Sequence, residues 1–168
     1  VVVDLPFGSY EISPEQALET SVRFFKEAGA MAVKLEGAHL ATVEKLTSSG
    51  IPVMGHVGLT PQSLHQLGGY RVQGRSDGDA ILEAALALEK AGAFAIVLEL
   101  VPAELATRIT AALTIPTIGI GAGVACDAQV LVWTDMVGLT KNAPKLAKAY
   151  RNLRSEISAA AQEFAADV

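Results

Sequence analysis

The stretch Glu27-Ala-Gly-Ala-Met-Ala-Val-Lys-Leu-Glu36 decides the fold, because the chain repeats it almost unchanged at Lys90-Ala-Gly-Ala-Phe-Ala-Ile-Val-Leu-Glu99. In each copy a glycine ends a helical pattern, and a short apolar run then ends on one carboxylate. A helical segment and a second strand follow each copy. Glu36 and Glu99 lie 63 positions apart. Four such periods would occupy roughly 250 residues and contain eight strands, the size of a (β/α)8 barrel.

The composition favours one globular domain and excludes several classes of protein. Of the 168 residues, 51% are hydrophobic and 18% are charged, which is ample for a packed core. The net charge of -5, with no run of Lys or Arg longer than two, argues against nucleic acid as a partner. No apolar run is long enough to predict a membrane span. A single cysteine, Cys126, cannot form an internal disulfide, so we predict a reducing, cytoplasmic setting and a buried role for its side chain.

Strands and helices alternate along the whole chain with short connections, the pattern of a parallel α/β protein. The helix after Ser13-Pro14-Glu15 has an N-cap, a first-turn proline and an acidic residue near its positive end. The segment 58–79 is the longest irregular one. We expect strands at residues 1–7, 31–36, 52–57, 94–100, 117–120 and 129–135, the first of them buried, and helices at residues 14–29, 41–49, 80–91, 102–113 and 144–164.

Polar residues at the carboxyl ends of these strands predict a site. Asp4, Glu36 and Glu99 each end an apolar strand, and in parallel α/β folds these ends form the active face. Lys34 lies two positions before Glu36, so both side chains point to the same side of their strand, which in a barrel can be the interior. His56 lies at the same end of the next strand. The five side chains could converge on one pocket, with a lysine for a substrate carboxylate, acids for a hard cation and one acid for proton transfer.

Each of these residues also has an ordinary structural interpretation. A lone strand-end acid can cap a helix, Lys34 and Glu36 can form a plain ion pair, and a strand histidine can be a hydrogen-bonded core residue. The glycines of residues 119–123 fit either a phosphate cradle or close packing, and they lack the lysine of a phosphate-binding loop. Residues 68–75 fit either an arginine-bearing lid or a solvated loop. Only the coincidence of five polar residues on successive strand ends favours a site.

Several blocks of the sequence resemble the ketopantoate hydroxymethyltransferase family. The resemblance covers nearly the whole chain, in order, and the blocks are specific when taken together. They are Asp4-Leu-Pro-Phe-Gly-Ser-Tyr10, Val33-Lys-Leu-Glu-Gly37, Gly55-His-Val-Gly-Leu-Thr-Pro-Gln62, Gly68-Gly-Tyr-Arg-Val-Gln-Gly-Arg75, Leu98-Glu-Leu-Val-Pro102 and Ile118-Gly-Ile-Gly-Ala-Gly123.

The resemblance implies a (β/α)8 barrel of the phosphoenolpyruvate/pyruvate superfamily that binds Mg²⁺. It implies transfer of a hydroxymethyl group from 5,10-methylenetetrahydrofolate to 3-methyl-2-oxobutanoate, giving 2-dehydropantoate for pantothenate biosynthesis, by a homo-oligomer, specifically a decamer. Asp4 and Glu36 match metal ligands, and Asp4 and Lys34 match substrate contacts. Glu99 matches the general base, with His56 beside it to tune it. Because the strand before Glu99 is apolar, partial desolvation should make this carboxylate a better proton acceptor.

The sequence also departs from the family pattern. We expect residues 1–168 to form a single barrel domain that lacks the first two strand/helix units, and with them a further metal-ligating Asp and a substrate-binding Ser. Three segments look shorter than usual, and Ala38 stands where a second glycine is expected. Two other functions stay open: a Mg²⁺-dependent aldolase or lyase acting on another 2-oxo acid, and a catalytically silent barrel fragment that serves as a binding module.

Overall fold

One parallel sheet organises residues 1–129. The computed structural model describes all residues from 1 to 168, and its six strands lie side by side in the order in which they occur in the sequence, every neighbouring pair parallel. The α/β prediction is therefore confirmed. The strands are β1 (Val2–Asp4), β2 (Ala32–Lys34), β3 (Val53–Gly58), β4 (Ala95–Glu99), β5 (Thr117–Ile120) and β6 (Ala128–Gln129).

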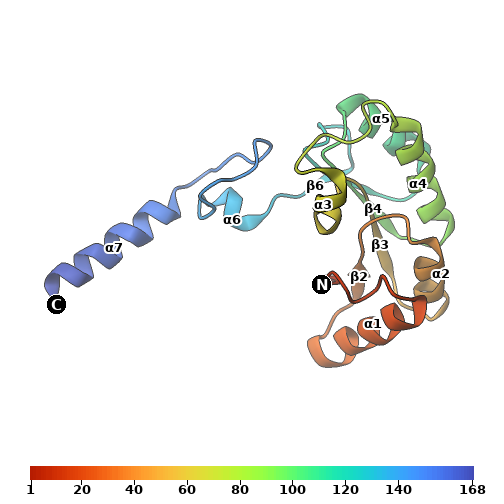
Figure 1. Cartoon of the computed structure of the whole chain (residues 1–168), viewed down its shortest axis with the longest axis horizontal. Coiled ribbons are helices and arrows are strands. Elements are labelled where there is room, and N and C mark those ends of the chain that lie inside the picture. Colours follow the sequence, from red (N-terminus) through yellow and green to blue (C-terminus); the bar gives the residue numbers. More distant parts are fainter. The chain divides into compact units, whose positions relative to one another are not determined.

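The helices between the strands begin and end close to the predicted residues. Helix α1 starts as expected, because the Ser13 hydroxyl accepts a hydrogen bond from the Gln16 peptide N–H at 3.2 Å, and it stops at Gly29 in the left-handed region. Four helices lie along the outer side of the curved sheet (Figure 1). They are α1 (Pro14–Ala28), α2 (Leu40–Ser48), α4 (Gly78–Lys90) and α5 (Ala103–Ala112).

The two faces of the sheet differ in chemistry because side chains alternate along each strand. One face packs against the helices and forms the core, with Leu35 and Leu98 fully buried. Gly55 belongs to this face, since a Cβ there would come within 3.1 Å of Leu88 in α4. Burying one such leucine stabilises the fold by about 1.5–3 kcal/mol. The opposite face is left for polar groups, and it holds all five predicted site residues.

Some predicted elements differ from the observed ones. The first strand is shorter than expected and is not buried, because β1 lies at one edge of the sheet and Val1 and Val2 are 79% and 41% exposed. The segment 58–79, expected to be irregular, contains the short helices η1 (Pro61–Ser63) and α3 (Leu64–Leu67). The proline that opens η1 and the glycine that follows α3 were the available sequence signals.

The C-terminal residues form a second compact unit, Val130–Val168. The predicted strand 129–135 is wrong beyond Gln129, because the Asp135 and Met136 peptide N–H groups donate to the Val132 carbonyl and close a helical turn, α6 (Trp133–Met136). The predicted helix 144–164 instead runs as α7 (Leu153–Asp167), capped by the Asn152 side chain. The prediction that residues 1–168 make one barrel domain stays a prediction. None of the helices is both long and apolar enough to cross a membrane.

Gly58, at the end of β3, provides a test of this packing. Its φ is +96°, and an added Cβ would collide with the Glu99 carbonyl oxygen and lie 2.7 Å from Val101. We expect Gly58→Ala to lower the free energy of unfolding by about 1–3 kcal/mol more than Gly50→Ala does. Gly50 is a matched control, since it also has positive φ, +83°, but nothing lies within 4 Å of its Cβ position. Urea unfolding measures both, and equal losses would contradict the close approach.

Candidate active site

The parallel register brings the five predicted residues together on one face of the sheet. Asp4 pairs with Lys34 between β1 and β2, and the Gly58–Glu99 pair closes the ladder between β3 and β4. Glu36 lies two residues beyond the end of β2, so its side chain points to the same side as Lys34. His56 lies on β3 between these two acidic ends. The prediction that these residues share a face at the strand ends is therefore confirmed.

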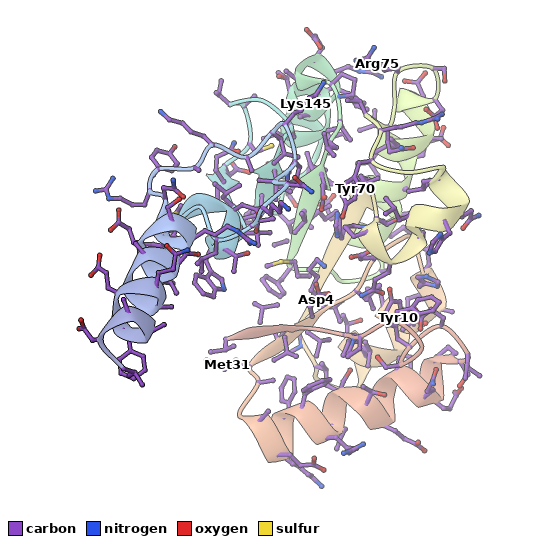
Figure 2. All side chains as sticks on the ribbon, turned by 60° about the vertical axis from the view of Figure 1, so that its left-hand side comes forward. Asp4, Tyr10, Met31, Tyr70, Arg75 and Lys145 are labelled. Carbon is purple, nitrogen blue, oxygen red and sulfur yellow. The ribbon has the colours of Figure 1, made fainter.

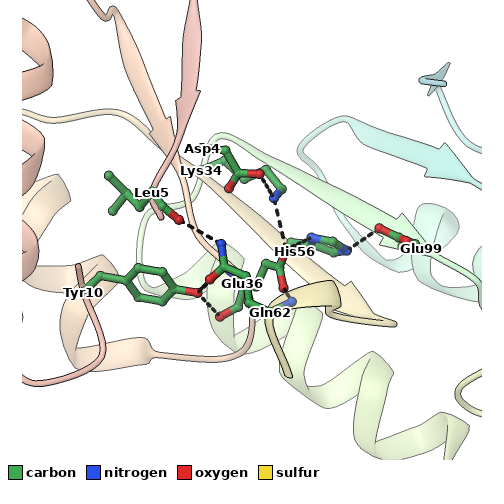
Figure 3. Close-up of polar contacts among 8 residues, drawn as sticks. All are labelled: Asp4, Leu5, Tyr10, Lys34, Glu36, His56, Gln62 and Glu99. Atoms are coloured by element: carbon green, nitrogen blue, oxygen red, sulfur yellow. Dashed lines mark hydrogen bonds and ion pairs between the residues drawn. The ribbon is translucent and has the colours of Figure 1, made fainter. Parts of the chain in front are cut away.

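Their charged groups form a continuous chain of contacts (Figure 3). The Lys34 Nζ lies 2.7 Å from Asp4 Oδ2 and 3.7 Å from Glu36 Oε1. His56 extends this series of contacts, with Nδ1 3.9 Å from Glu36 Oε1 and Nε2 3.3 Å from Glu99 Oε2. Three carboxylates thus face one ammonium and one imidazole, and with a neutral imidazole the cluster carries net negative charge.

Burial differs sharply between the two ends of this chain of contacts. The Asp4 side chain is 55% exposed, whereas the Glu36 side chain is only 5% exposed. A buried carboxylate requires compensating partners, because desolvation disfavours its charged form. Asp4 is therefore the residue of the cluster most open to a ligand from solvent. Glu36 is held inside by its neighbours.

The buried imidazole of His56 has no hydrogen bond of good geometry at either ring nitrogen. Buried polar groups without partners are rare in folded proteins and call for an explanation. Here each nitrogen is directed toward a carboxylate, Glu36 on one side and Glu99 on the other. His56 therefore lies between two carboxylates without a hydrogen bond of good geometry to either. Its part in a site stays a prediction.

The oxygen atoms of the cluster have the chemistry that Mg²⁺ prefers. Asp4 and Glu36 are the two carboxylates in contact with Lys34, and Asp4 is accessible. No group of three or more His, Cys, Asp or Glu side chains is arranged to enclose a metal ion. Two carboxylates would leave most positions of a magnesium ion to water and substrate, which is usual for this metal.

Two residues without a predicted role complete the surroundings of Glu36. The Gln62 peptide N–H donates to Glu36 Oε2 at 2.8 Å, and the Tyr10 hydroxyl donates to Gln62 Oε1 at 2.6 Å. Tyr10 is buried, and its ring makes an edge contact with His39, a residue to which the sequence assigned nothing. Tyr10 is the last residue of the quoted block that begins with Asp4, and Gln62 is the last residue of the quoted block that contains His56. That position was the only signal in the sequence.

The backbone beneath Glu99 is also unusual. Leu100 has a φ of +47°, the left-handed region that costs a leucine about 1–2 kcal/mol. Two hydrogen bonds hold it there, since its N–H donates to the Ile120 carbonyl and its own carbonyl accepts from Gln73 N–H, both at 2.9 Å. Strained residues of this kind gather at functional sites. Leu100 turns the chain at the point where Glu99 enters the cluster.

The remaining sequence features lie apart from the cluster. Gly119, in β5, and Gly123, after it, serve close packing, because a Cβ on Gly119 would come within 2.9 Å of the buried Cys126 sulfur and a Cβ on Gly123 within 2.6 Å of Ala103. Tyr70 and Arg75 lie on the connection between α3 and α4 (Figure 2), and Tyr70 is exposed. Arg75 lines a cavity of about 550 Å³ with residues at the start of α5, and none of the five cluster residues lines it.

Solved structures with similar folds come from barrel enzymes. A phosphonopyruvate hydrolase matches 98% of this chain with 58% of its own, at a TM-score of 0.53 and 15% identity. A proposed phosphonomutase from Burkholderia cenocepacia J2315 matches 77% of this chain with 62% of its own, at a TM-score of 0.56 and 20% identity. These neighbours show the class of fold, a (β/α)8 barrel, and the chain supplies six parallel strands of it.

Sequence comparison places the chain within this class. The family model for ketopantoate hydroxymethyltransferase matches residues 1–168, and the chain belongs to that family. A 3-methyl-2-oxobutanoate hydroxymethyltransferase from Acidothermus cellulolyticus is 64% identical over the whole chain, and one from Thermobifida fusca is 59% identical. The chain spans 64% and 61% of the lengths of these two relatives.

Tyr10 gives the site a testable pH dependence. Burial raises the pKa of Tyr10 to about 12, against a hydrogen bond from the Glu36 backbone that lowers it, and nearby carboxylates add to the rise. Below pH 10 the phenol is protonated in both the folded and the unfolded chain, so its contribution to stability is complete. Between pH 10 and 12 only the unfolded chain ionises, so the free energy of unfolding should fall by about 2–3 kcal/mol.

The measurement is urea unfolding of the parent and of Tyr10→Phe across this pH range. We expect the parent to lose more stability than the variant, because the variant has no phenol to ionise at this position. Tyr70→Phe is the matched control, since Tyr70 is exposed and its loss should leave the pH dependence unchanged. Parallel curves for the parent and Tyr10→Phe would show that this phenol ionises equally in both states.

Proposed function

We propose that the protein carrying this chain transfers a hydroxymethyl group from 5,10-methylenetetrahydrofolate to 3-methyl-2-oxobutanoate, giving 2-dehydropantoate for pantothenate biosynthesis. The names of its relatives support this reaction. The observation that carries the proposal is the position of the buried His56, between Glu36 and Glu99 and beside the Lys34–Asp4 pair. This arrangement offers a base, a cation and oxygen ligands within one cluster.

Glu99 has the position of the general base. Its carboxylate is largely buried and contacts His56 Nε2 at 3.3 Å, while the other charged groups lie beyond the imidazole. It would take the proton from C3 of the oxo acid, and the electron pair of that C–H bond would move into an enolate with its negative charge on the C2 oxygen. The enolate carbon would then form the new bond to the methylene carbon, whose two bonds to the folate nitrogens break, while water supplies the hydroxyl oxygen and tetrahydrofolate is released.

Lys34 and Asp4 have the positions of substrate-binding groups. The Lys34 ammonium would offset the negative charge of the substrate carboxylate. Its hydrogen bond to Asp4 would keep the ammonium directed toward the open side of the cluster. His56 would tune Glu99 from its other side.

Mg²⁺ fits the same cluster as a further component. Asp4 and Glu36 would hold it, and when bound it would supply a Lewis acid that stabilises negative charge on the 2-oxo group. Resemblance to the family supports this metal, and it also supports a cytoplasmic homo-oligomer, specifically a decamer. We include both in the proposal. No residue is assigned to the folate.

Replacing Glu99 separates proton abstraction from binding. We expect Glu99→Gln in the full-length protein to bind 3-methyl-2-oxobutanoate as the parent does. Exchange of the C3 hydrogen with deuterated water should fall by about 10²–10⁴-fold, because the amide cannot accept the proton. Proton NMR follows the exchange and calorimetry follows the binding. Exchange at the parental rate would overturn the assignment of Glu99.

The control for this experiment is Glu104→Gln, a matched change at the exposed start of α5, which should leave exchange unchanged. Product formation in the presence and absence of the folate then separates the proposed reaction from that of an aldolase or lyase acting on another 2-oxo acid. A lyase would give exchange without a folate-dependent product. A silent binding module would give neither.

Metal binding should depend on the substrate. With only two carboxylate ligands, Mg²⁺ alone should bind weakly, and 3-methyl-2-oxobutanoate should tighten it by supplying two further oxygens. Asp4→Asn should weaken binding by more than about tenfold, equivalent to about 1.4 kcal/mol. Calorimetry with and without the oxo acid measures this, with Asp79→Asn at an exposed ion pair as the control. Equal affinities with and without the oxo acid would count against the site.

A further inference from the structure

Gln62 joins the ends of three successive strands through one residue. Its peptide N–H donates to Glu36 Oε2 at 2.8 Å, beyond β2, and its side-chain Nε2 donates to the carbonyl of Leu5 at 2.9 Å, just beyond β1. Gln62 itself lies in η1, which follows β3. These contacts are drawn in Figure 3. One side chain and its own peptide group thus fix the relative positions of the strand ends that carry Asp4, Glu36 and His56.

Tyr10 completes this network with one hydroxyl. The group donates to Gln62 Oε1 at 2.6 Å and accepts from the Glu36 peptide N–H at 3.3 Å. A hydroxyl has one proton to donate, so the short bond to Gln62 fixes the direction of that proton and leaves a lone pair for the N–H of Glu36. The tyrosine is 2% exposed, so water is not available to replace it. Glu36 is therefore held at its backbone and at its carboxylate.

The consequence for Glu36 is that its two carboxylate oxygens are not equivalent. Oε2 accepts the hydrogen bond from Gln62, whereas Oε1 has no hydrogen bond and faces the Lys34 ammonium at 3.7 Å and the His56 imidazole at 3.9 Å. A terminal carboxylate torsion is broad and two-fold, so nothing within the side chain itself selects this orientation. The hydrogen bond from the Gln62 peptide N–H to Oε2 selects this orientation.

We propose that Tyr10 and Gln62 are positioning residues that act through Glu36, holding one of its oxygens back so that the other is presented to Lys34 and His56. The inference rests on the proposed function, because it assigns these residues a part in oxo-acid and metal binding at the same cluster. Neither residue touches the substrate in this assignment. Their effect passes entirely through the orientation of the Glu36 carboxylate.

Competition for Lys34 explains why the orientation matters. The Lys34 Nζ lies 2.7 Å from the exposed Asp4, to which it donates a hydrogen bond. It lies 3.7 Å from the buried Glu36, with which it forms a longer ion pair. A released Glu36 carboxylate could turn both oxygens toward the ammonium, where attraction at low local dielectric is strong. Lys34 would then be drawn inward, away from Asp4 and from the open side where a substrate carboxylate would bind.

The test uses Tyr10→Phe and Gln62→Met in the full-length protein. At nearly constant volume, each removes side-chain hydrogen bonds, from Tyr10 to Gln62 Oε1 or from Gln62 Nε2 to the Leu5 carbonyl, that hold the Gln62 peptide N–H in place against Glu36 Oε2. We expect kcat/KM for 3-methyl-2-oxobutanoate to fall by about 10–100-fold in each, the range found for residues that orient ligand-binding side chains. The double variant should lose little more than the worse single one, because both act through one network. In a Glu36→Gln background, Tyr10→Phe should change oxo-acid affinity by less than about twofold.

A spectroscopic measurement tests the orientation without activity. In protein labelled with ¹³C at glutamate carboxyls, the Glu36 resonance is identified by its loss in Glu36→Gln. We expect it to shift in Tyr10→Phe and in Gln62→Met. Thr47→Val is the matched control, because it removes a partly buried hydroxyl that ties α2 to the Ala91 carbonyl at 3.0 Å, far along the strands from the cluster. It should reduce stability while leaving both the resonance and kcat/KM unchanged.

The outcomes separate the two proposals. If the parent protein neither binds nor turns over the oxo acid, the proposed function fails, and the Glu36 resonance still decides whether Tyr10 and Gln62 set the carboxylate. If the parent is active and Tyr10→Phe and Gln62→Met retain its kcat/KM and its Glu36 resonance, the positioning role is wrong. A loss in Tyr10→Phe that persists unchanged in the Glu36→Gln background would also overturn it, because the effect would not pass through Glu36.

Discussion

The buried carboxylate of Glu36 is the constraint on which the site depends. Removing such a group from water is costly unless several partners offset its charge and occupy its lone pairs. The partners come from different elements: Lys34 from β2, His56 from β3 and the Gln62 peptide from η1. No single element could supply them. The strand ends must therefore lie in one register for the acid to be tolerated, and the same register assembles the rest of the cluster.

Parallel pairing makes this register strict. Lys34 and Glu36 point to the polar face. Val33, before Lys34, and Leu35, between Lys34 and Glu36, are fully buried on the opposite face. A slip of β2 by one residue would exchange the two sets, placing charges against α1 and α2 and apolar side chains in the site. The apolar core that stabilises the fold therefore also determines which side chains reach the cluster. The alternation of side chains between the two faces of the sheet thus determines both the stability of the fold and the geometry of the site.

This explains why much of the site could be predicted from the sequence. The period of two along apolar strands and the carboxyl-end position of Asp4, Glu36 and Glu99 need only local sequence. Tyr10 and Gln62 could not be found in this way, because their partners lie up to 57 positions away along the chain. The end of the first unit was missed for a different reason. Val130 to Val132 continue an apolar strand pattern, and only the turn closed on the Val132 carbonyl ends it.

The two copies of the repeated strand show how neighbours alone can place two identical side chains in different environments. Glu36 and Glu99 end almost the same sequence, yet Glu36 has an ammonium, an imidazole and a peptide N–H around its carboxylate, whereas Glu99 has the imidazole alone. A carboxylate with donors on several sides is fixed in position, which suits a ligand or a structural anchor. A carboxylate with only one neighbouring imidazole keeps lone pairs that no donor occupies. His56 contacts both acids, so it does not distinguish them. The difference lies in the Lys34 ammonium and the Gln62 peptide N–H, which contact Glu36 alone.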